Sequence, residues 1–511
     1  MKKITVLTMI SLFCFIPALL PAQSQFSLSD YEAFLQAHED MSAEALLQHH
    51  APDQPYYDDR QAATNFSDYA YYDSVLTALD LTEDELAVLN QYHMVVTERH
   101  SYKSFGRALH EVYMNDLPVL VTTDALLHAL HMSYDQILKR LELSVLGPNL
   151  RDILEELYDA IPTLIAAYPQ GDTLQDALRD VDTYITVARS LLEETQFAPH
   201  IADAGDIQSV FDAIESEDYL WMPLFSYEDR YLDFSQFTVR GHYTDDEVLI
   251  EQAIPLSAYF KSMMWLGRID FLLASVSNGT GVTQHSVKRM NLAAAMLNEL
   301  LDESGARDLL EANDDITRQM VGESDNLTPF ELSDIADSLD INSAEDLLVD
   351  SVYVEWRAAL NNSVNAGQQI LSSIIIADPF SSTPDPLPVS FKLLGQRFIL
   401  DSYIFSSLVY DRLTHQGTKT WRPMPNPLDA MFVLGNEDAL PLIESEMNQY
   451  HYADEIAALR YLTDSYDNGF WHQSLYNLWL QAIRAVNPPA STDNLPFFMQ
   501  TTAWHQEKLN T

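Results

Sequence analysis

The chain has 511 residues, of which 76 are acidic and only 28 are basic, giving a formal net charge of −48. This charge repels nucleic acid and anionic lipid headgroups, so neither is expected as a partner. Cys14 is the only cysteine, which excludes an intrachain disulfide. Because Cys14 lies in the leader described next, thiolate zinc sites and cysteine nucleophiles are also excluded from the mature protein.

The first 24 residues have the layout of a secretory signal peptide. Two lysines precede an apolar run over residues 4–20, and small residues follow at Ala22 and Ser24. We expect cleavage after Ser24, with cleavage after Ala22 as the second choice and a retained membrane anchor as the alternative. No later apolar stretch is long enough to span a bilayer. The sequence therefore predicts an exported protein, periplasmic or extracellular, without stable membrane insertion after cleavage.

The acidic composition is more typical of solvation than of binding. Removal of Lys2 and Lys3 with the leader leaves 26 basic and 76 acidic side chains, a net charge of −50. Salt screens such self-repulsion, because the Debye length falls to about 3 Å near 1 M. A marine or halophilic medium is the simplest explanation, and calcium binding by surface carboxylates is the alternative.

We predict that the thermal midpoint of the purified protein rises strongly as NaCl is added over the molar range. The physical reason is that added salt screens the repulsion among the excess carboxylates, which destabilises the compact state. The measurement is a series of thermal melts from low to high salt. A midpoint that stays the same across the series would contradict the halophilic interpretation.

Helix-start signals recur along the chain. Each pairs an N-cap oxygen with a glutamate three residues later, at Ser29-x-x-Glu32, Thr82-x-x-Glu85, Thr328-x-x-Glu331 and Asn342-x-x-Glu345. Apolar residues at helical spacing predict helices over residues 124–142, 172–195, 256–276, 285–302, 400–413, 453–465 and 471–486. Alternating runs that indicate strands are few and cover residues 94–98, 117–122, parts of 220–243, and 388–394.

These patterns predict a mostly α protein with a few short β elements. We expect one large multi-helix domain, for which a toroid-like helical array is one form. The chain divides into residues 1–24 as the signal peptide, residues 25–75 as an N-terminal helical and irregular segment, and residues 76–511 as the main helical domain. A last helix is expected after Pro496, and it reaches Thr511 without a capping signal.

The helix over residues 124–142 carries the first candidate site. Asp124, His128, His131 and Asp135 are spaced i, i+4, i+7 and i+11, so they share one face. An apolar strand leads into this helix, and we therefore expect that face to turn inward, towards a polar cavity. The four side chains could bind zinc or another divalent metal, or transfer protons. The alternative is ordinary His–Asp hydrogen bonding in a helix bundle.

Two further clusters place cationic side chains in apolar surroundings. Arg240, His242 and Tyr243 lie in a predicted turn, and Arg268 lies in a nearly continuous apolar helix, where it needs a carboxylate partner or a bound anion. In the third cluster, "LLGQRFILDSYIF", Arg397 has Asp401 four residues on, and the two could pair with each other. The cationic side chains of both clusters could form buried ion pairs, or they could line a positively charged pocket.

Several stretches of the chain, taken in order, resemble one family. They are "LPVLVTTDALLHALHMSYDQILKRLE", "RGHYT", "SMMWLGRIDF", "VGESDNLTP", "LGQRFILDSYIFSSLVY", "LDAMFVLG" and "LPFFMQTTAWHQEKLNT". Together they are similar to a bacterial and archaeal family of unknown function numbered 3160. The resemblance implies an exported protein and no particular activity. It also implies a pattern that continues beyond Thr511, so we expect the chain to be incomplete at its C-terminal end.

Two classes of function follow from the sequence. The first is an exported enzyme acting on glycan or cell-envelope material, whose candidate catalytic residues around a cleft are His128, His131, Asp124, His242, Tyr243, Arg268 and Arg397. The second is a non-catalytic periplasmic or surface protein that has a binding or structural role. In such a protein, the arginines and histidines stabilise the fold. Convergence of the three clusters on one pocket would favour the enzyme, and separate packing contacts would favour the second class. The substrate or ligand stays unknown at this point.

Overall fold

The computed structural model describes ten stretches of the chain, and helices dominate them, which confirms the mostly α prediction. The described residues are 28–50, 71–92, 95–97, 99–117, 123–168, 172–245, 254–276, 281–363, 368–370 and 382–486. The predicted leader, most of the strand over residues 117–122 and the helix after Pro496 lie outside them. Within the described residues, no helix is both long enough and apolar enough to cross a membrane.

The described chain belongs to two compact units, and the division falls inside helix α7 (Thr123–Leu141). The smaller unit contains the first part of α7, up to Ser133. It also contains three short helices, α4 (Tyr72–Leu79), α5 (Glu83–Tyr92) and α6 (Phe105–Met114). The larger unit contains everything from Tyr134 to Arg484. Two N-terminal helices also belong to it, α2 (Leu28–Ala37) and α3 (Ala43–His49).

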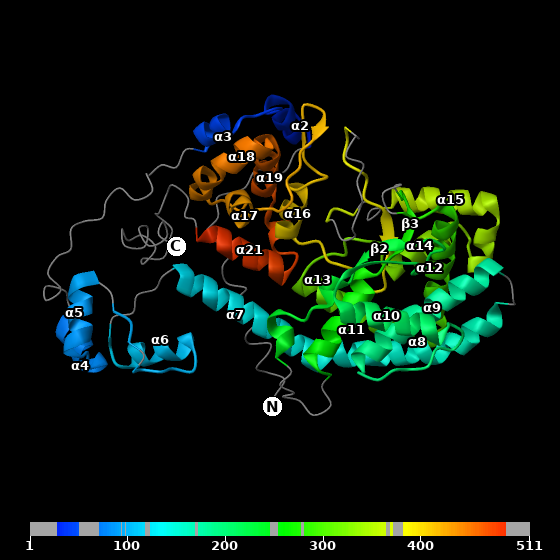
Figure 1. Ribbon diagram of the computed structural model, residues 1–511, viewed down its shortest axis with the longest axis horizontal. Helices are drawn as coiled ribbons and strands as arrows, with labels where there is room; N and C mark the ends of the chain where they lie inside the picture. Colours follow the sequence, from blue (N-terminus) through cyan, green and yellow to red (C-terminus); the bar gives the residue numbers. More distant parts are fainter. Residues whose placement is uncertain are drawn as a thin grey trace. The chain divides into compact units, whose positions relative to one another are not determined.

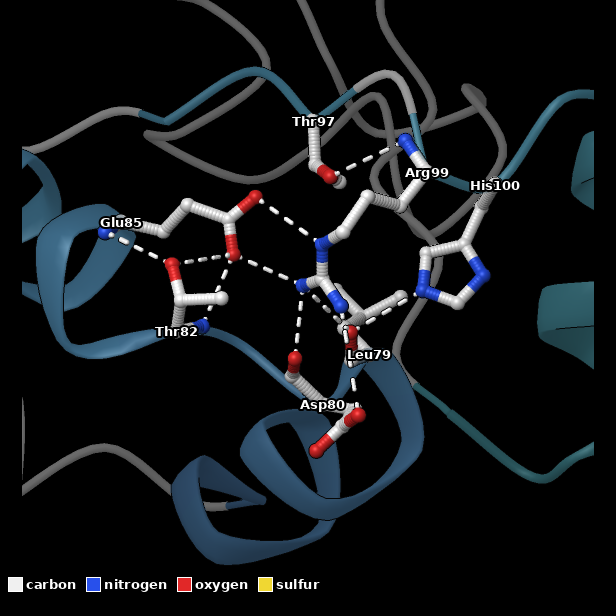
Figure 2. A network of polar contacts seen from close by, with 7 residues as sticks. All are labelled: Leu79, Asp80, Thr82, Glu85, Thr97, Arg99 and His100. Atoms are coloured by element: carbon white, nitrogen blue, oxygen red, sulfur yellow. Dashed lines mark hydrogen bonds and ion pairs between the residues drawn. The ribbon is translucent and has the colours of Figure 1, made fainter.

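An arginine joins two of these short helices, α4 and α5 (Figure 2). Arg99 Nη2 donates to the Glu85 carboxylate at 2.7 Å and to the Asp80 carbonyl oxygen at 2.6 Å. The predicted capping pair is confirmed here, because Thr82 N donates to Glu85 Oε2 at 2.8 Å and Glu85 N donates to Thr82 Oγ1 at 3.3 Å. These bonds, first from the Thr82 backbone and then from Arg99, lower the pKa of Glu85 to about 2.

Three long helices form the first core of the larger unit (Figure 1). They are α8 (Gly147–Ala167), α9 (Asp172–Leu192) and α12 (Gln284–Ser304), which pack on one another. Their apolar side chains recur every three or four residues, so each helix buries a continuous stripe. Around them lie α10 (Ala204–Ser216), α11 (Leu256–Arg268), α13 (Arg307–Met320), α14 (Pro329–Ser338), α15 (Asp350–Asn362) and the 3-10 turn η6 (Ala344–Leu348).

The predicted helix over residues 256–276 is too long. Helix α11 ends at Arg268, and the chain continues as strand β3 (Phe271–Ala274), which pairs antiparallel with β4 (Val389–Phe391). All four residues of β3 are buried. A short apolar run that is buried on both faces has no period that separates strand from helix, so its distant pairing partner decides its structure. The predicted strand over residues 388–394 is present, but it is shorter, because β4 covers only Val389–Phe391.

A second core lies in the C-terminal part of the larger unit, and α2 and α3 pack against it through Ala43, Leu46 and Phe34. Its helices are α16 (Leu400–Ser407), α17 (Pro427–Val433), α18 (Glu444–Tyr450), α19 (Ala453–Ser465), α20 (Asn468–Trp471), α21 (Leu475–Ala485) and the 3-10 turn η7 (Glu437–Ile443). The predicted helix over residues 453–465 is therefore confirmed. The helix predicted over residues 400–413 ends early, at Ser407, and the helix predicted over residues 471–486 begins late, at Leu475.

Local signals fixed some boundaries and missed others. Thr328 and Glu331 form the predicted capping box of α14. The box expected at Asn342 is displaced by one residue, because Ser343 and Asp346 make it instead. Both arrangements match the same sequence pattern. Helix α2 already begins at Leu28, so the expected start at Ser29 is also displaced, and residues 95–97 are irregular rather than a strand.

An ion cluster around the fully buried pair Arg422 and Asp429 stabilises the second core. Arg422 Nη2 donates to Asp429 at 2.6 Å and to Glu446 at 2.7 Å, and its Nη1 donates to the Leu408 carbonyl oxygen at 2.8 Å. The Tyr452 hydroxyl donates to the second oxygen of Asp429 at 3.0 Å. Arg422 and Asp429 are both 0% exposed. Their charges are therefore held without water, by each other and by neighbouring polar groups.

Candidate functional site

Helix α7 carries the four side chains that form the first predicted site, and most of them are exposed. Asp124, His128 and His131 are exposed, whereas Asp135 is half-buried. The expectation that all four face inward is therefore wrong for the first three. That expectation assumes that a helix which follows an apolar strand has two buried faces. Between Asp124 and Ser133, however, Ala125 is the one fully buried residue.

The metal hypothesis for α7 receives no support from the arrangement of these side chains. Among the residues that the structure describes, no group of three or more His, Cys, Asp or Glu side chains is placed to hold a metal ion. Asp124, His128, His131 and Asp135 are all among them. The helical spacing puts them in one row, but a row along a helix does not by itself converge on a point.

The second half of α7 leads into a π-helical turn. The turn η2 (Glu142–Leu146) follows α7 directly, and α8 begins at Gly147. Gly147 suits this place, because a Cβ there would lie 2.8 Å from the Glu142 carbonyl oxygen. Turns of this kind are rare and often mark functional sites. Here the turn directs Glu142 into the protein, where it is 6% exposed.

Two carboxylates hold the ring of His242 between them. His242 lies in the 3-10 turn η4 (Gly241–Thr244). Its Nδ1 is 2.9 Å from Asp135 Oδ1, and its Nε2 is 2.7 Å from Glu142 Oε2. An ionised carboxylate only accepts hydrogen bonds, so this arrangement favours the ring form in which both nitrogens donate, which is the positively charged one. Burial alone would lower the pKa of His242, but the bonds and charges of Glu142 and Asp135 raise it overall.

The same turn makes two more polar contacts with α7 and η2. The Tyr243 hydroxyl donates to Glu142 Oε1 at 2.6 Å, and the buried Lys139 pairs with Asp245. Burial, and then the charge of Glu142, raise the pKa of Tyr243 well above its usual value, so Tyr243 stays protonated. We call the six residues Asp135, Lys139, Glu142, His242, Tyr243 and Asp245 the polar clasp. It joins the turn η4 to three successive positions on one face of α7 and η2.

Arg268 lies beside the polar clasp and bonds amide side chains. Its Nη2 donates to Gln236 Oε1 at 3.4 Å, and Gln236 also accepts from Arg240 at 3.3 Å. With the amide oxygen of Gln396 turned towards it, Arg268 Nε donates to that oxygen at 2.9 Å. Burial lowers the pKa of Arg268, while the charge of Asp233 opposes this effect. Arg268 thus connects the segment before η4 to the segment before α16.

Arg397 is not paired with Asp401, contrary to one of the two expectations. Its Nη2 donates to Asp314 Oδ1 at 2.6 Å, whereas Asp401 accepts from the Tyr476 hydroxyl at 2.8 Å. Helix α16 begins at Leu400, so Arg397 precedes it and the i, i+4 relation of a helix does not apply. Arg397 instead forms an antiparallel bridge with Ser324 in the "VGESDNLTP" stretch.

The sequence reasoning missed the residues at the centre of the polar clasp. Lys139 and Glu142 follow Asp135 at i+4 and i+7, so the same spacing rule extended forward along the helix would have found them. Lys392 was also missed, although it is a cation inside the apolar run "PVSFKLL". It is 1% exposed, and burial lowers its pKa to about 8 against the opposing charge of Asp270.

The polar clasp should contribute stability that depends on pH. The pKa of His242 is raised in the folded protein, so its contribution is complete below the unfolded value of about 6.5 and is lost as pH rises through the folded value. We expect His242→Gln to cost about 1–3 kcal/mol of unfolding free energy at pH 6 and less at pH 9. Denaturant titrations at both pH values measure the difference.

The exposed His472 provides the matched control for that experiment. His472→Gln removes an imidazole without removing the bonds of the polar clasp, so it should leave stability unchanged at both pH values. A cost of His242→Gln that grows as pH rises would show that the ring is not held in its charged form.

The comparisons with known proteins identify a family. Residues 82–511 match the family described as protein of unknown function (DUF3160). No curated protein and no solved structure matches the chain. The match covers most of the chain, including the polar clasp, Arg268 and Arg397, and it agrees with the resemblance found in the sequence motifs. The chain belongs to the DUF3160 family.

Proposed function

We propose that the protein is exported and acts by binding a ligand at its surface, without catalysing a reaction. One observation carries the non-catalytic part of this proposal, which is that both ring nitrogens of His242 bond to carboxylates. A histidine that acts as a general base needs a free nitrogen within reach of substrate. His242 offers none while Asp135 and Glu142 hold it.

The other candidate catalytic residues of the larger unit support the same proposal. Tyr243 bonds to Glu142, Arg397 bonds to Asp314, and Arg268 bonds to Gln236. Each bond links segments that lie far apart in the sequence, as expected for residues that hold a fold together. Buried charges of this kind need such partners, and they destabilise the fold when one partner is lost.

A turnover assay tests the non-catalytic proposal. The protein is incubated in saline buffer with neutral and acidic oligosaccharides and with peptidoglycan fragments, and the products are analysed by mass spectrometry. We expect no product from the wild type. A product that disappears in a folded Glu142→Gln variant would overturn the proposal and favour the enzyme, for which the inward-directed Glu142 on a π-helical turn is the supporting observation.

Export is tested separately, by sequencing the N-terminus of the protein secreted from a bacterial host. We expect the mature chain to begin at Gln25, or at Gln23 if cleavage follows Ala22, because small residues precede both positions. As a control, replacing Lys2 and Lys3 by glutamate should retain the protein inside the cell. An intact Met1 on the wild-type protein, found in the cytoplasm, would refute export.

A further inference from the structure

A small hairpin in the larger unit presents aromatic side chains to solvent. Strand β1 (Tyr219–Met222) pairs antiparallel with β2 (Arg230–Asp233), and Trp221 lies directly opposite Tyr231. Successive side chains in a strand alternate between the two faces. The inner face therefore carries Leu232 and Arg230, both buried, and the outer face carries Tyr219, Trp221 and Tyr231. We call these three residues the aromatic strip.

Two rings of the aromatic strip are exposed, and both stack on the half-buried ring of Tyr231. Tyr219 is 50% exposed and Trp221 is 52% exposed. The ring centroids of Tyr219 and Trp221 lie 5.9 Å and 5.1 Å from that of Tyr231, with interplanar angles of 25° and 30°. Exposed aromatic groups that gather in one place, rather than singly, are a mark of binding surfaces. A ligand of the aromatic strip is therefore expected to have an apolar face that packs on these rings.

Charge restricts which ligand fits. Glu217 and Asp218 precede the strip and Asp229 lies at the start of β2, and all three carboxylates are exposed. They repel acidic groups, and they accept hydrogen bonds from hydroxyl groups. A pyranose ring combines an apolar C–H face, which stacks on an aromatic ring, with hydroxyl groups around its edge. A glycan without acidic groups therefore fits both the aromatic rings, through its C–H face, and the carboxylates, through its hydroxyl groups.

Ring orientation argues against an organic cation as the ligand. A cation is held best over the face of a ring, and a cage for it needs rings that surround it from different directions. Tyr219 and Trp221 instead both stack on Tyr231, each with its ring plane within 30° of the Tyr231 plane. Elsewhere the protein supplies its own cation to an aromatic face, as with Arg289 over Tyr227 at 4.9 Å.

We propose that the aromatic strip binds a non-acidic glycan. This inference rests on the proposed function, since it names the ligand class of a protein that binds without catalysis. Tyr219 and Trp221 provide the stacking faces, and the flanking carboxylates accept the hydroxyl hydrogen bonds and exclude acidic chains. The strip lies on a hairpin whose inner face is anchored by Arg230, which bonds to the Asp270 carbonyl oxygen at 2.9 Å.

Calorimetric titration of the full chain with cellohexaose and with chitohexaose tests the proposal. We expect saturable binding of at least one, and about tenfold or greater loss of affinity in Tyr219→Ala and in Trp221→Ala. Trp421→Ala is the matched control, because Trp421 is 66% exposed but lies outside the strip. It should bind as the wild type does. Oligogalacturonate, which is acidic, should not bind.

Each other outcome overturns the proposal. Binding of neither neutral hexasaccharide, or binding that both strip variants retain in full, excludes the strip as a glycan site. Strip-dependent binding of tetramethylammonium without glycan binding identifies an organic cation site instead. These results are distinct from failure of the proposed function, which would appear as product formation lost in Glu142→Gln while the strip variants still turn over substrate.

Discussion

Replacing Arg422 by alanine is expected to lower the free energy of unfolding by about 3–5 kcal/mol. The substitution leaves Asp429 fully buried without its cation, and it also removes the bonds to Glu446 and to the Leu408 carbonyl oxygen. The guanidinium group also lies over the Tyr452 ring, 4.2 Å from its centroid, so packing is lost as well. Chemical denaturation at neutral pH measures the effect.

A surface arginine provides the control for that substitution. Arg318 pairs with Asp315, and both side chains are more than 40% exposed, so Arg318→Ala should cost less than about 1 kcal/mol. If Arg422→Ala is too unstable to purify, Asp429→Asn provides a milder test, because it keeps the shape and removes one charge. Equal effects of Arg422→Ala and Arg318→Ala would show that the buried cluster does not hold the second core.

Lys392 is expected to make stability rise with pH in the alkaline range. Its pKa is about 8 in the folded protein, because burial disfavours the ammonium form, compared with 10.5 for an ordinary lysine. Between these values the unfolded chain binds the proton and the folded chain does not, so unfolding becomes less favourable as pH rises. At 1.36 kcal/mol per pKa unit, the full window corresponds to about 3 kcal/mol.

The variant Lys392→Met isolates this effect from the other groups that titrate at high pH. The unfolding free energy of the wild type, minus that of the variant, should increase by about 3 kcal/mol between pH 7.5 and 10.5. Lys288→Met is the control, because the Lys288 ammonium group pairs at 3.6 Å with the exposed Asp350, and its difference should stay flat. A difference that stays constant, or falls, for Lys392 would mean that the lysine does not release its proton in the folded protein.

Sequence reasoning worked best where the interactions are local. The capping boxes at Thr82 and Thr328 involve residues three positions apart, so pattern and structure coincide. The long amphipathic helices α9, α12 and α19 were predicted for a related reason, since an apolar period over several turns leaves few alternatives. Strand β3 was not predicted, because the strand with which it pairs lies more than a hundred residues further along the chain.

The difference between local and long-range interactions also explains why the candidate site was predicted only in part. Asp135 on α7 and the turn at His242 were each recognised as polar groups in unusual places, but their pairing spans about a hundred residues. Helical spacing states which side chains share a face, and it does not state which way that face points. The prediction for α7 therefore identified Asp135 and placed the rest of the site about one to three turns too early, at Asp124, His128 and His131.

The π-helical turn between α7 and α8 makes the length of this segment matter more than its composition. The turn holds one residue more than an α-helical turn, because its hydrogen bond joins residues five apart, whereas an insertion or deletion in α7 or α8 themselves would rotate all that follows by about 100°. The apolar stripe of α8 would then turn away from α9 and α12, or Glu142 would turn away from His242. Substitutions in the turn can be absorbed one at a time. An insertion or deletion in the helices that flank the turn cannot be absorbed, so during evolution the gene should tolerate changes of codon here long before it tolerates a change in the number of codons.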